Sequence, residues 1–202
     1  MQRVRLRDIT VAFEARGQGA PLVLIHGGFV SMRSWREQIH HFSKTHRVVR
    51  FDLRGHGQTT RSSGVYSVPR FAEDVESLLE HLDMGSFFCW GHSLGGMIAQ
   101  ELARRDDERV RGLILADTTY TTNRTLSDKV ATAMSRAVWG VSSVQQIGAW
   151  ASRHMGGRSP EVGAYVREYH MELARSRDTA HTILASVFRH DARPWLHELR
   201  CP

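Results

Sequence analysis

A serine flanked by glycines, in the pattern Gly91-x-Ser93-x-Gly95, is the strongest candidate for chemistry in this sequence. An apolar run that ends at Trp90 precedes it, and a segment of helical composition begins at Gly96. A serine on so tight a strand-to-helix turn is held in a strained backbone conformation with its hydroxyl exposed, and side chains two residues to either side would collide. The motif therefore predicts Ser93 as a nucleophile that carries an acyl group.

A second glycine turn supplies candidate hydrogen-bond donors for that chemistry. It consists of His26 followed by two glycines, and it ends the apolar run Pro21–Ile25. Acyl transfer builds negative charge on a carbonyl oxygen, which two aimed N–H groups can stabilise. We expect one donor to be the N–H of Leu94 and the other to be that of Gly28, or of Phe29 if the turn is displaced by one residue. His26 itself is expected to be structural and bonded to backbone.

A carboxylate and an arginine share the loop that follows the apolar run His46–Phe51. Asp52 could serve as the acid of a catalytic triad. A structural role is the favoured interpretation, in which Asp52 accepts hydrogen bonds from loop N–H groups and pairs with Arg54. His92 lies beside the candidate nucleophile, but neighbouring residues of a turn point in different directions, so we expect it to pack rather than to react.

Alternating strands and helices must position these residues. The predicted strands, or strand-like segments, are Val4–Phe13, Pro21–Ile25, His46–Phe51, Ser86–Trp90 and Val110–Ala116. The predicted helices are Met32–Phe42, Val68–Leu82 and Gly96–Arg104. Such alternation is typical of a mostly parallel sheet with helices on both faces. Ligands of such sheets bind at the carboxyl ends of the strands, where the candidate residues above and Asp117 all fall.

The alternation of predicted strands and helices ends after Thr118. Residues 122–189 have helical periodicity and no convincing strand, and they predict a helical cap over the rim of the sheet. Its large side chains are candidates to line a pocket, although each could instead pack the cap helices together: Trp139, Trp150, Met155, Tyr165, Tyr169 and Met171. Pro194–Leu199 predicts one short helix. The resulting division is a core at 1–121, a cap at 122–192 and the start of a return to the core at 193–202.

Composition narrows the function classes. The formal net charge is +6, but the only lysines are Lys44 and Lys129 and the arginines are spread along the chain, so we expect a solvated surface rather than a nucleic-acid site. The two cysteines, Cys89 and Cys201, do not make a disulfide framework. No run approaches the roughly 20 apolar residues that span a bilayer. Met1–Arg5 lacks the apolar core of a signal peptide, so a cytoplasmic location is expected.

The order and spacing of the three motifs resemble the α/β-hydrolase superfamily. The segments concerned are Leu24–Gly28, Phe51–Gly57 and Gly91–Gly96, and they are most similar to 3-oxoadipate enol-lactonases and related serine esterases. The resemblance implies a mostly parallel sheet with an inserted helical cap, and a serine activated by a histidine that a carboxylate holds. It implies no metal or organic cofactor and a small ester, lactone or thioester as substrate. No nucleic-acid or membrane partner is expected, and homo-oligomerisation is left open.

One departure from the family concerns the rest of the triad. In the family, a segment resembling Leu196–Pro202 leads into the next core strand, and the acid and the histidine follow later. The resemblance thus implies that this chain stops before both, without its C-terminal core strands. Substitutes within the chain would be Asp117 and one of three histidines, His181, His190 or His197.

Two functions of different classes follow from the sequence. The first is hydrolysis of a small carboxylic ester, lactone or thioester through an acyl-enzyme on Ser93. The second is a catalytically inactive hydrolase-fold fragment that binds a ligand or partner, since absent strands would leave a sheet edge unpaired.

Overall fold

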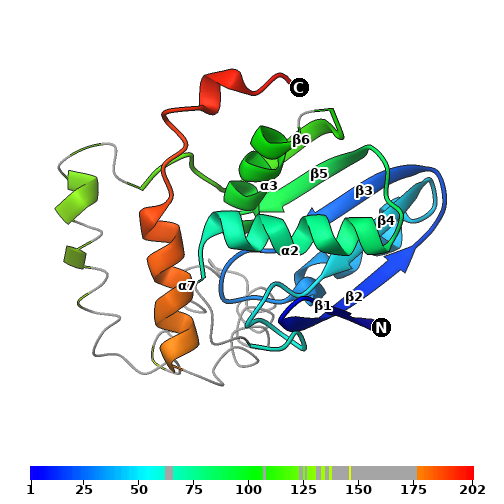
Figure 1. The fold of residues 1–202 in the computed structure, drawn as a ribbon, viewed down its shortest axis with the longest axis horizontal. Helices are drawn as coiled ribbons and strands as arrows, with labels where there is room; N and C mark the ends of the chain where they lie inside the picture. The colour runs from blue at the N-terminus through cyan, green and yellow to red at the C-terminus, as the bar shows by residue number, and fades with distance from the viewer. Residues whose placement is uncertain are drawn as a thin grey trace, which may run out of the picture.

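The computed structural model contains one sheet, whose strands in the described part of the chain lie in the order β1-β2-β4-β3-β5-β6 (Figure 1). The described residues are 1–61, 66–106, 108–122, 125, 127–130, 133–134, 137, 146 and 177–202. The strands are β1 (Gln2–Leu6), β2 (Ile9–Arg16), β3 (Ala20–Ile25), β4 (His46–Phe51), β5 (Phe87–His92) and β6 (Val110–Ala116). Strands β4, β3, β5 and β6 are mutually parallel, whereas β1 and β2 join antiparallel at one edge.

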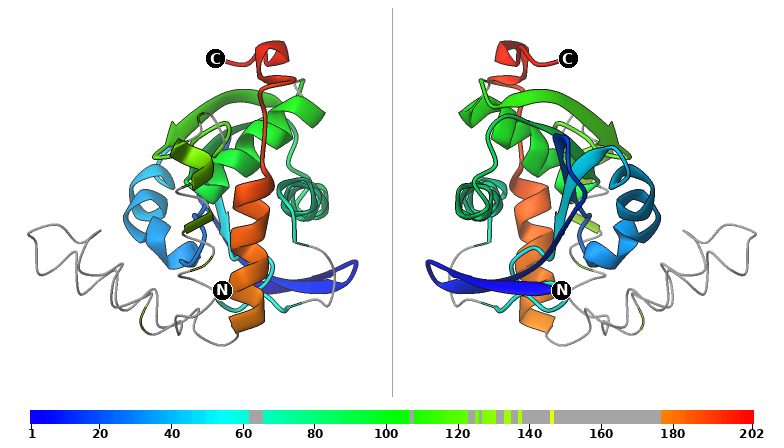
Figure 2. Two further views of the ribbon diagram at one scale, coloured as in Figure 1. Left: turned by 90° about the vertical axis from the view of Figure 1, so that its left-hand side faces the viewer. Right: turned by 90° about the vertical axis from the view of Figure 1, so that its right-hand side faces the viewer.

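Helices cover both faces of the sheet, as the alternation predicts. The described helical segments are η1 (Met32–Trp35), α1 (Arg36–Phe42), α2 (Val68–His81), α3 (Leu94–Arg105), α7 (Arg177–Arg189) and η2 (Leu196–Glu198). Figure 2 shows α1 on the opposite side of the sheet from α2 and α3. An amphipathic stripe explains α2, because Phe71, Val75 and Leu78 are all fully buried.

The core divides into two clusters because successive strand residues face opposite sides of a sheet. In β3, Val23 and Ile25 pack with α2 and α3, whereas Leu22 and Leu24 pack with η1 and α1. Helices cover both faces of the central strands, so the apolar residues of these strands follow one another in continuous runs. The alternation of apolar and polar residues that is typical of a half-exposed strand is therefore absent from these runs.

The predicted elements agree closely with those of the structure. Strands β4 and β6 have the predicted bounds, and β3 begins one residue earlier than predicted. The segment 4–13 consists of two strands, because Arg7 adopts a positive φ of 47° and reverses the chain. A further difference lies around Ser93, where β5 continues to His92 and α3 begins at Leu94. The turn there is thus shorter than the predicted 91–95.

The two ends of the predicted cap lie side by side. Thr121 forms an antiparallel bridge with Asp191, and the N–H of Ala192 donates to the C=O of Tyr120 at 2.8 Å. The cap boundaries at 122 and 192 stay predictions, because most residues between them lie outside the described part of the chain. Among the described helices, none combines the length and the apolar character needed to cross a bilayer.

Strand β6 is the last strand of the sheet within the described residues. Its Ile114 and Leu115 are 49% and 43% exposed, which is unusual for apolar residues of a parallel strand. The N–H of Leu113 donates to the C=O of Pro202 at 2.9 Å, so the end of the chain runs against this edge.

A buried ion pair ties the loop after β4 to α2 and to the β1–β2 turn. The Arg54 side chain is fully buried, and it donates to both carboxylate oxygens of Asp74 at 2.5 and 2.6 Å. It also reaches Asp8, which is 40% exposed, at 3.2 Å. The expected pairing of Arg54 with Asp52 is wrong, because the guanidinium points to α2 rather than back along its own loop.

We predict that Asp74→Ala lowers the free energy of unfolding by about 3–5 kcal/mol, because it leaves the Arg54 charge buried without its main partner. Asp8→Ala is the matched control, and it should cost less than about 1 kcal/mol because Asp8 is solvent-screened. Urea denaturation of the three proteins measures both values. Equal losses in the two variants would contradict the account of Arg54.

Candidate active site

Ser93 is the single residue that connects β5 to α3, and its backbone conformation is one that few residues adopt. Its φ is 51° and its ψ is −117°. The surrounding backbone holds this conformation: the Ser93 N–H donates to the C=O of Ala116 at 3.0 Å, and the Ser93 C=O accepts from the Thr118 hydroxyl at 2.7 Å. The strand–turn–helix context that the G-x-S-x-G motif predicts is therefore present.

The glycines around Ser93 are explained by contact distances. A Cβ on Gly91 would lie 2.3 Å from the carbonyl oxygen of Gly95, and a Cβ on Gly95 would lie 2.1 Å from the carbonyl oxygen of Ile25. Real Cβ atoms do not approach backbone oxygens so closely, so α3 can start beside the end of β3 only with glycine at both positions.

The turn after β3 lies against Ser93 and supplies backbone donors. The N–H of Phe29, which has a φ of 65°, donates to Nε2 of His56 at 3.4 Å. In the described part of the chain, the N–H groups of Gly28 and Leu94 have no hydrogen-bond partner. The sequence left Gly28 and Phe29 open as the second oxyanion-hole donor. Of these two residues, Gly28 is the one whose N–H forms no hydrogen bond among the described residues.

Two buried histidines hold the loops that follow β3 and β4. His26 bonds through Nδ1 to the C=O of Gly27 at 2.7 Å, and its Nε2 accepts the N–H of Leu53 at 3.0 Å. The structural role predicted for His26 is confirmed by these bonds. His56 bonds through Nδ1 to the C=O of Arg54 at 3.0 Å, and sequence reasoning gave it no role. The only sequence signal for it was its place in a loop rich in glycine.

Asp52 has the structural role that the sequence favoured. Its two carboxylate oxygens accept the N–H groups of Met32 at 2.7 Å and Gln58 at 2.8 Å. Burial raises the pKa of this carboxyl, against the opposing effect of those two bonds. The side chain therefore joins two loops, and it makes no bond to a histidine among the described residues.

The structure places Asp117 next to a different histidine from those expected. Its Oδ2 lies 3.9 Å from Nε2 of His92, and its side chain is 88% exposed. Among the described residues, no hydrogen bond or ion pair joins Asp117 to the three expected histidines, His181, His190 and His197. His190 instead packs against Trp195, with the ring centroids 6.2 Å apart.

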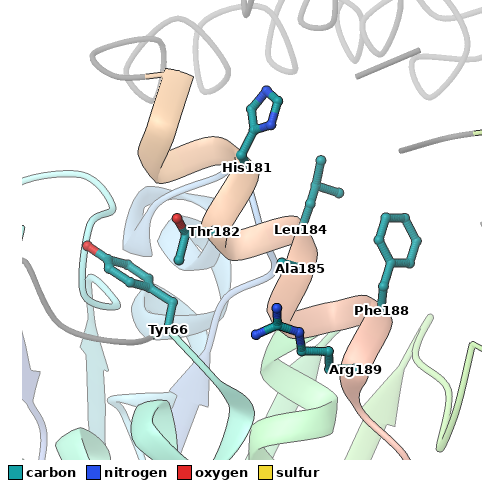
Figure 3. Close-up of a pocket in the computed structure, with 7 residues that line it drawn as sticks. All are labelled: Tyr66, His181, Thr182, Leu184, Ala185, Phe188 and Arg189. Carbon is teal, nitrogen blue, oxygen red and sulfur yellow. The ribbon is translucent and has the colours of Figure 1, made fainter. Parts of the chain in front are cut away.

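The described part of the predicted cap consists mainly of α7, which carries none of the six large side chains proposed from the sequence to line a pocket. The side chains of Trp139, Trp150, Met155, Tyr165, Tyr169 and Met171 lie outside the described residues. Helix α7 borders a cavity of about 450 Å³ next to Tyr66. Thr182 and Arg189 lie on the side of α7 that faces Tyr66, whereas Leu184 and Phe188 point away from it (Figure 3).

Comparison with known proteins agrees with the fold described above. The family model for the alpha/beta hydrolase fold matches residues 20–158. The 3-oxoadipate enol-lactonase 2 of Acinetobacter baylyi is 26% identical over 201 residues, which are 97% of this chain and 74% of that protein. The (E)-2-((N-methylformamido)methylene)succinate hydrolase of the same organism is 30% identical over 111 residues, 55% of this chain and 42% of that protein.

A solved structure extends the similarity to the whole chain. The structure of a thermophilic esterase from Thermogutta terrifontis is 28% identical with a TM-score of 0.83, and the match covers 100% of this chain and 78% of that one. This chain belongs to the α/β-hydrolase fold family. The part of this chain that aligns with several curated relatives corresponds to less than half the length of those proteins.

The buried histidines predict a pH-dependent stability. Burial lowers the pKa of His26 to about 4 and that of His56 to about 3, below the 6.5 of an unfolded histidine. Between these values the unfolded state binds more protons, so stability is full above about pH 6.5 and is lost as the pH falls towards 4. Each histidine contributes a slope of at most about 1.4 kcal/mol per pH unit.

Urea unfolding at a series of pH values from 7 to 4.5 measures this slope. His56→Gln should make the slope shallower by at most about 1.4 kcal/mol per pH unit, and replacement of the exposed His41 by Gln serves as the control. A slope that His56→Gln does not alter would show that the two histidines are not the groups that titrate.

Proposed function

We propose that this chain carries the core of a serine hydrolase that acts on a small carboxylic ester, lactone or thioester. Ser93 is the nucleophile, and the N–H groups of Gly28 and Leu94 form the oxyanion hole. The conformation of Ser93 supports this proposal most strongly, because a positive φ on a glycine-bounded turn projects the hydroxyl beyond the backbone.

The local electrostatics fit acyl transfer. Attack by the Ser93 oxygen turns a carbonyl into a tetrahedral oxyanion, which two fixed N–H donors stabilise in the transition state. Leu94 is the first residue of α3, so the positive end of the helix dipole adds to its donor. The products are an acyl-enzyme and a released alcohol, thiol or, for a lactone, a tethered hydroxyl, and water then frees the acid.

A base for the serine proton is the remaining requirement, because a serine hydroxyl is a weak nucleophile at neutral pH. A histidine held by a carboxylate is the group that this fold family uses. Among the described residues, the Ser93 hydroxyl has no hydrogen bond to a histidine. His92 directly precedes Ser93 in the sequence, and its Nε2 lies 3.9 Å from Oδ2 of Asp117, so this pair is the first to test as base and acid.

The names of three similar proteins are those of hydrolases. One is described as a 3-oxoadipate enol-lactonase, another as a hydrolase of (E)-2-((N-methylformamido)methylene)succinate, and the solved structure as an esterase. These names support hydrolysis as the reaction class rather than any one substrate.

A second candidate function is a catalytically inactive module that binds a ligand or a partner. The observation that favours it is the last described strand, β6, with its exposed Ile114 and Leu115. An outer strand with apolar side chains can pair with another chain.

If a base completes the active site, we expect a fluorophosphonate to label Ser93 selectively, because the activated serine attacks phosphorus and the oxyanion hole stabilises the phosphonyl oxygen. Ser93→Ala should abolish the labelling, whereas Ser34→Ala, in the short helix η1, should not. Mass spectrometry of the intact and digested chain measures the site and the extent.

Hydrolysis of p-nitrophenyl butyrate separates the two candidate functions. Turnover well above the Ser93→Ala control requires a histidine of this chain as base, and His92→Gln and Asp117→Asn then test which one. Labelling that survives Ser93→Ala would contradict the assignment of the nucleophile, and absence of both labelling and turnover would favour the inactive module.

A further inference from the structure

Helix α7 crosses the rim of the sheet and brings one apolar side chain onto the turn after β3. Ile183 is 1% exposed. Its Cγ2 lies 3.6 Å from the point that a Cβ on Gly28 would occupy, and Cδ2 of Leu94 lies 3.7 Å from the same point. Ile183 therefore packs against Gly28, and it belongs to the same buried cluster as Leu94, the other residue of the proposed oxyanion hole.

We propose that Ile183 is a specificity-determining residue that closes the acyl side of the site and limits it to short acyl groups. The inference rests on the proposed function of Ser93, Gly28 and Leu94. A carbonyl oxygen that accepts from both N–H groups holds the next carbons of its acyl chain close to the Gly28 turn. Ile183 is the apolar side chain that touches this turn from α7, and its burial leaves no solvent-filled room behind it.

The remainder of α7 holds Ile183 in place. Cγ2 of Thr179 lies 2.8 Å from the Cβ position of Gly55, so the helix also contacts the loop after β4. One turn further along α7, the Ser186 hydroxyl donates to the C=O of Ile183 at 2.6 Å. The contacts of Thr179 with Gly55 and of Ile183 with Gly28 hold α7 against both loops, and the Ser186 bond lies within the helix itself.

Shortening Ile183 should open room for a longer chain. Large-to-small substitutions of buried residues leave apolar cavities because the surroundings relax only in part, and such cavities stay dry and accept small apolar groups. Discrimination between chains that differ by a methylene in an apolar pocket is on the order of tenfold or more. In Ile183→Ala, the ratio of hexanoate affinity to butyrate affinity should rise about tenfold relative to the unmodified chain.

Leu184 provides the matched control on the same helix. It borders the cavity beside Tyr66, and its side chain points away from Tyr66 (Figure 3). Leu184→Ala removes a similar number of carbons from α7 without touching Gly28. It should leave the affinity ratio unchanged.

The test is calorimetric titration of butyrate and hexanoate, the carboxylate products of simple esters, into the unmodified chain, Ile183→Ala and Leu184→Ala. Equilibrium binding of these acids needs no base, so the result does not depend on turnover. If Ile183→Ala fails to fold in a thermal melt, Ile183→Val should show a smaller change in the same direction.

A hexanoate gain confined to the Ile183 variants supports the proposal. An equal gain in Leu184→Ala, an unchanged ratio in all variants, or no binding of either acid to any of them overturns it. Fluorophosphonate labelling of Ser93 is measured separately. A hexanoate gain without labelling would support the role of Ile183 in limiting acyl length and would contradict the proposed role of Ser93 as nucleophile.

Discussion

The approach of α3 to the ends of β3 and β5 is the constraint on which the rest of this structure depends. Helix α3 begins one residue after Ser93, and the Cα of Gly95 lies so near the Ile25 carbonyl that no side chain fits there. Such a backbone costs about 1–3 kcal/mol and persists only where its surroundings enforce it. The bonds from Ser93 to Ala116 and Thr118, and the burial of most of α3, provide that enforcement.

The loops opposite Ser93 are held by buried polar side chains rather than by regular secondary structure. His26 and Asp52 satisfy backbone N–H groups of neighbouring loops, and His56 accepts the N–H of Phe29. Since unpaired buried N–H groups are costly, this arrangement leaves little backbone unsatisfied around the site. Gly28 and Leu94 differ from these residues, because among the described residues their N–H groups have no hydrogen-bond partner.

The sequence predicted what local pattern determines. Continuous apolar runs located β3, β4 and β6, and the G-x-S-x-G spacing located the turn at Ser93. The partners of Arg54 could not be predicted, because Asp74 and Asp8 are 20 and 46 residues away and meet it only when α2 packs on the sheet. The turn at Arg7 carries no glycine or proline, so its position inside 4–13 had no sequence signal.

The placement of Ile183 against Gly28 depends on how a helix far along the chain docks on the core. No periodicity within α7 specifies that contact, and pattern reasoning singled out aromatic residues of the cap instead. Hydrophobic periodicity identifies which face of a helix is buried but not the residue that it meets. Contacts between distant segments were therefore the part of the site that the sequence left open.

The most direct test of the account is a crystal structure of the chain after reaction with a fluorophosphonate. The account predicts that the phosphorus is bonded to the Ser93 oxygen and that the phosphonyl oxygen lies about 3 Å from both the Gly28 and Leu94 nitrogens. A phosphonyl oxygen that points to solvent or to the Phe29 nitrogen, or an adduct on another residue, would contradict it.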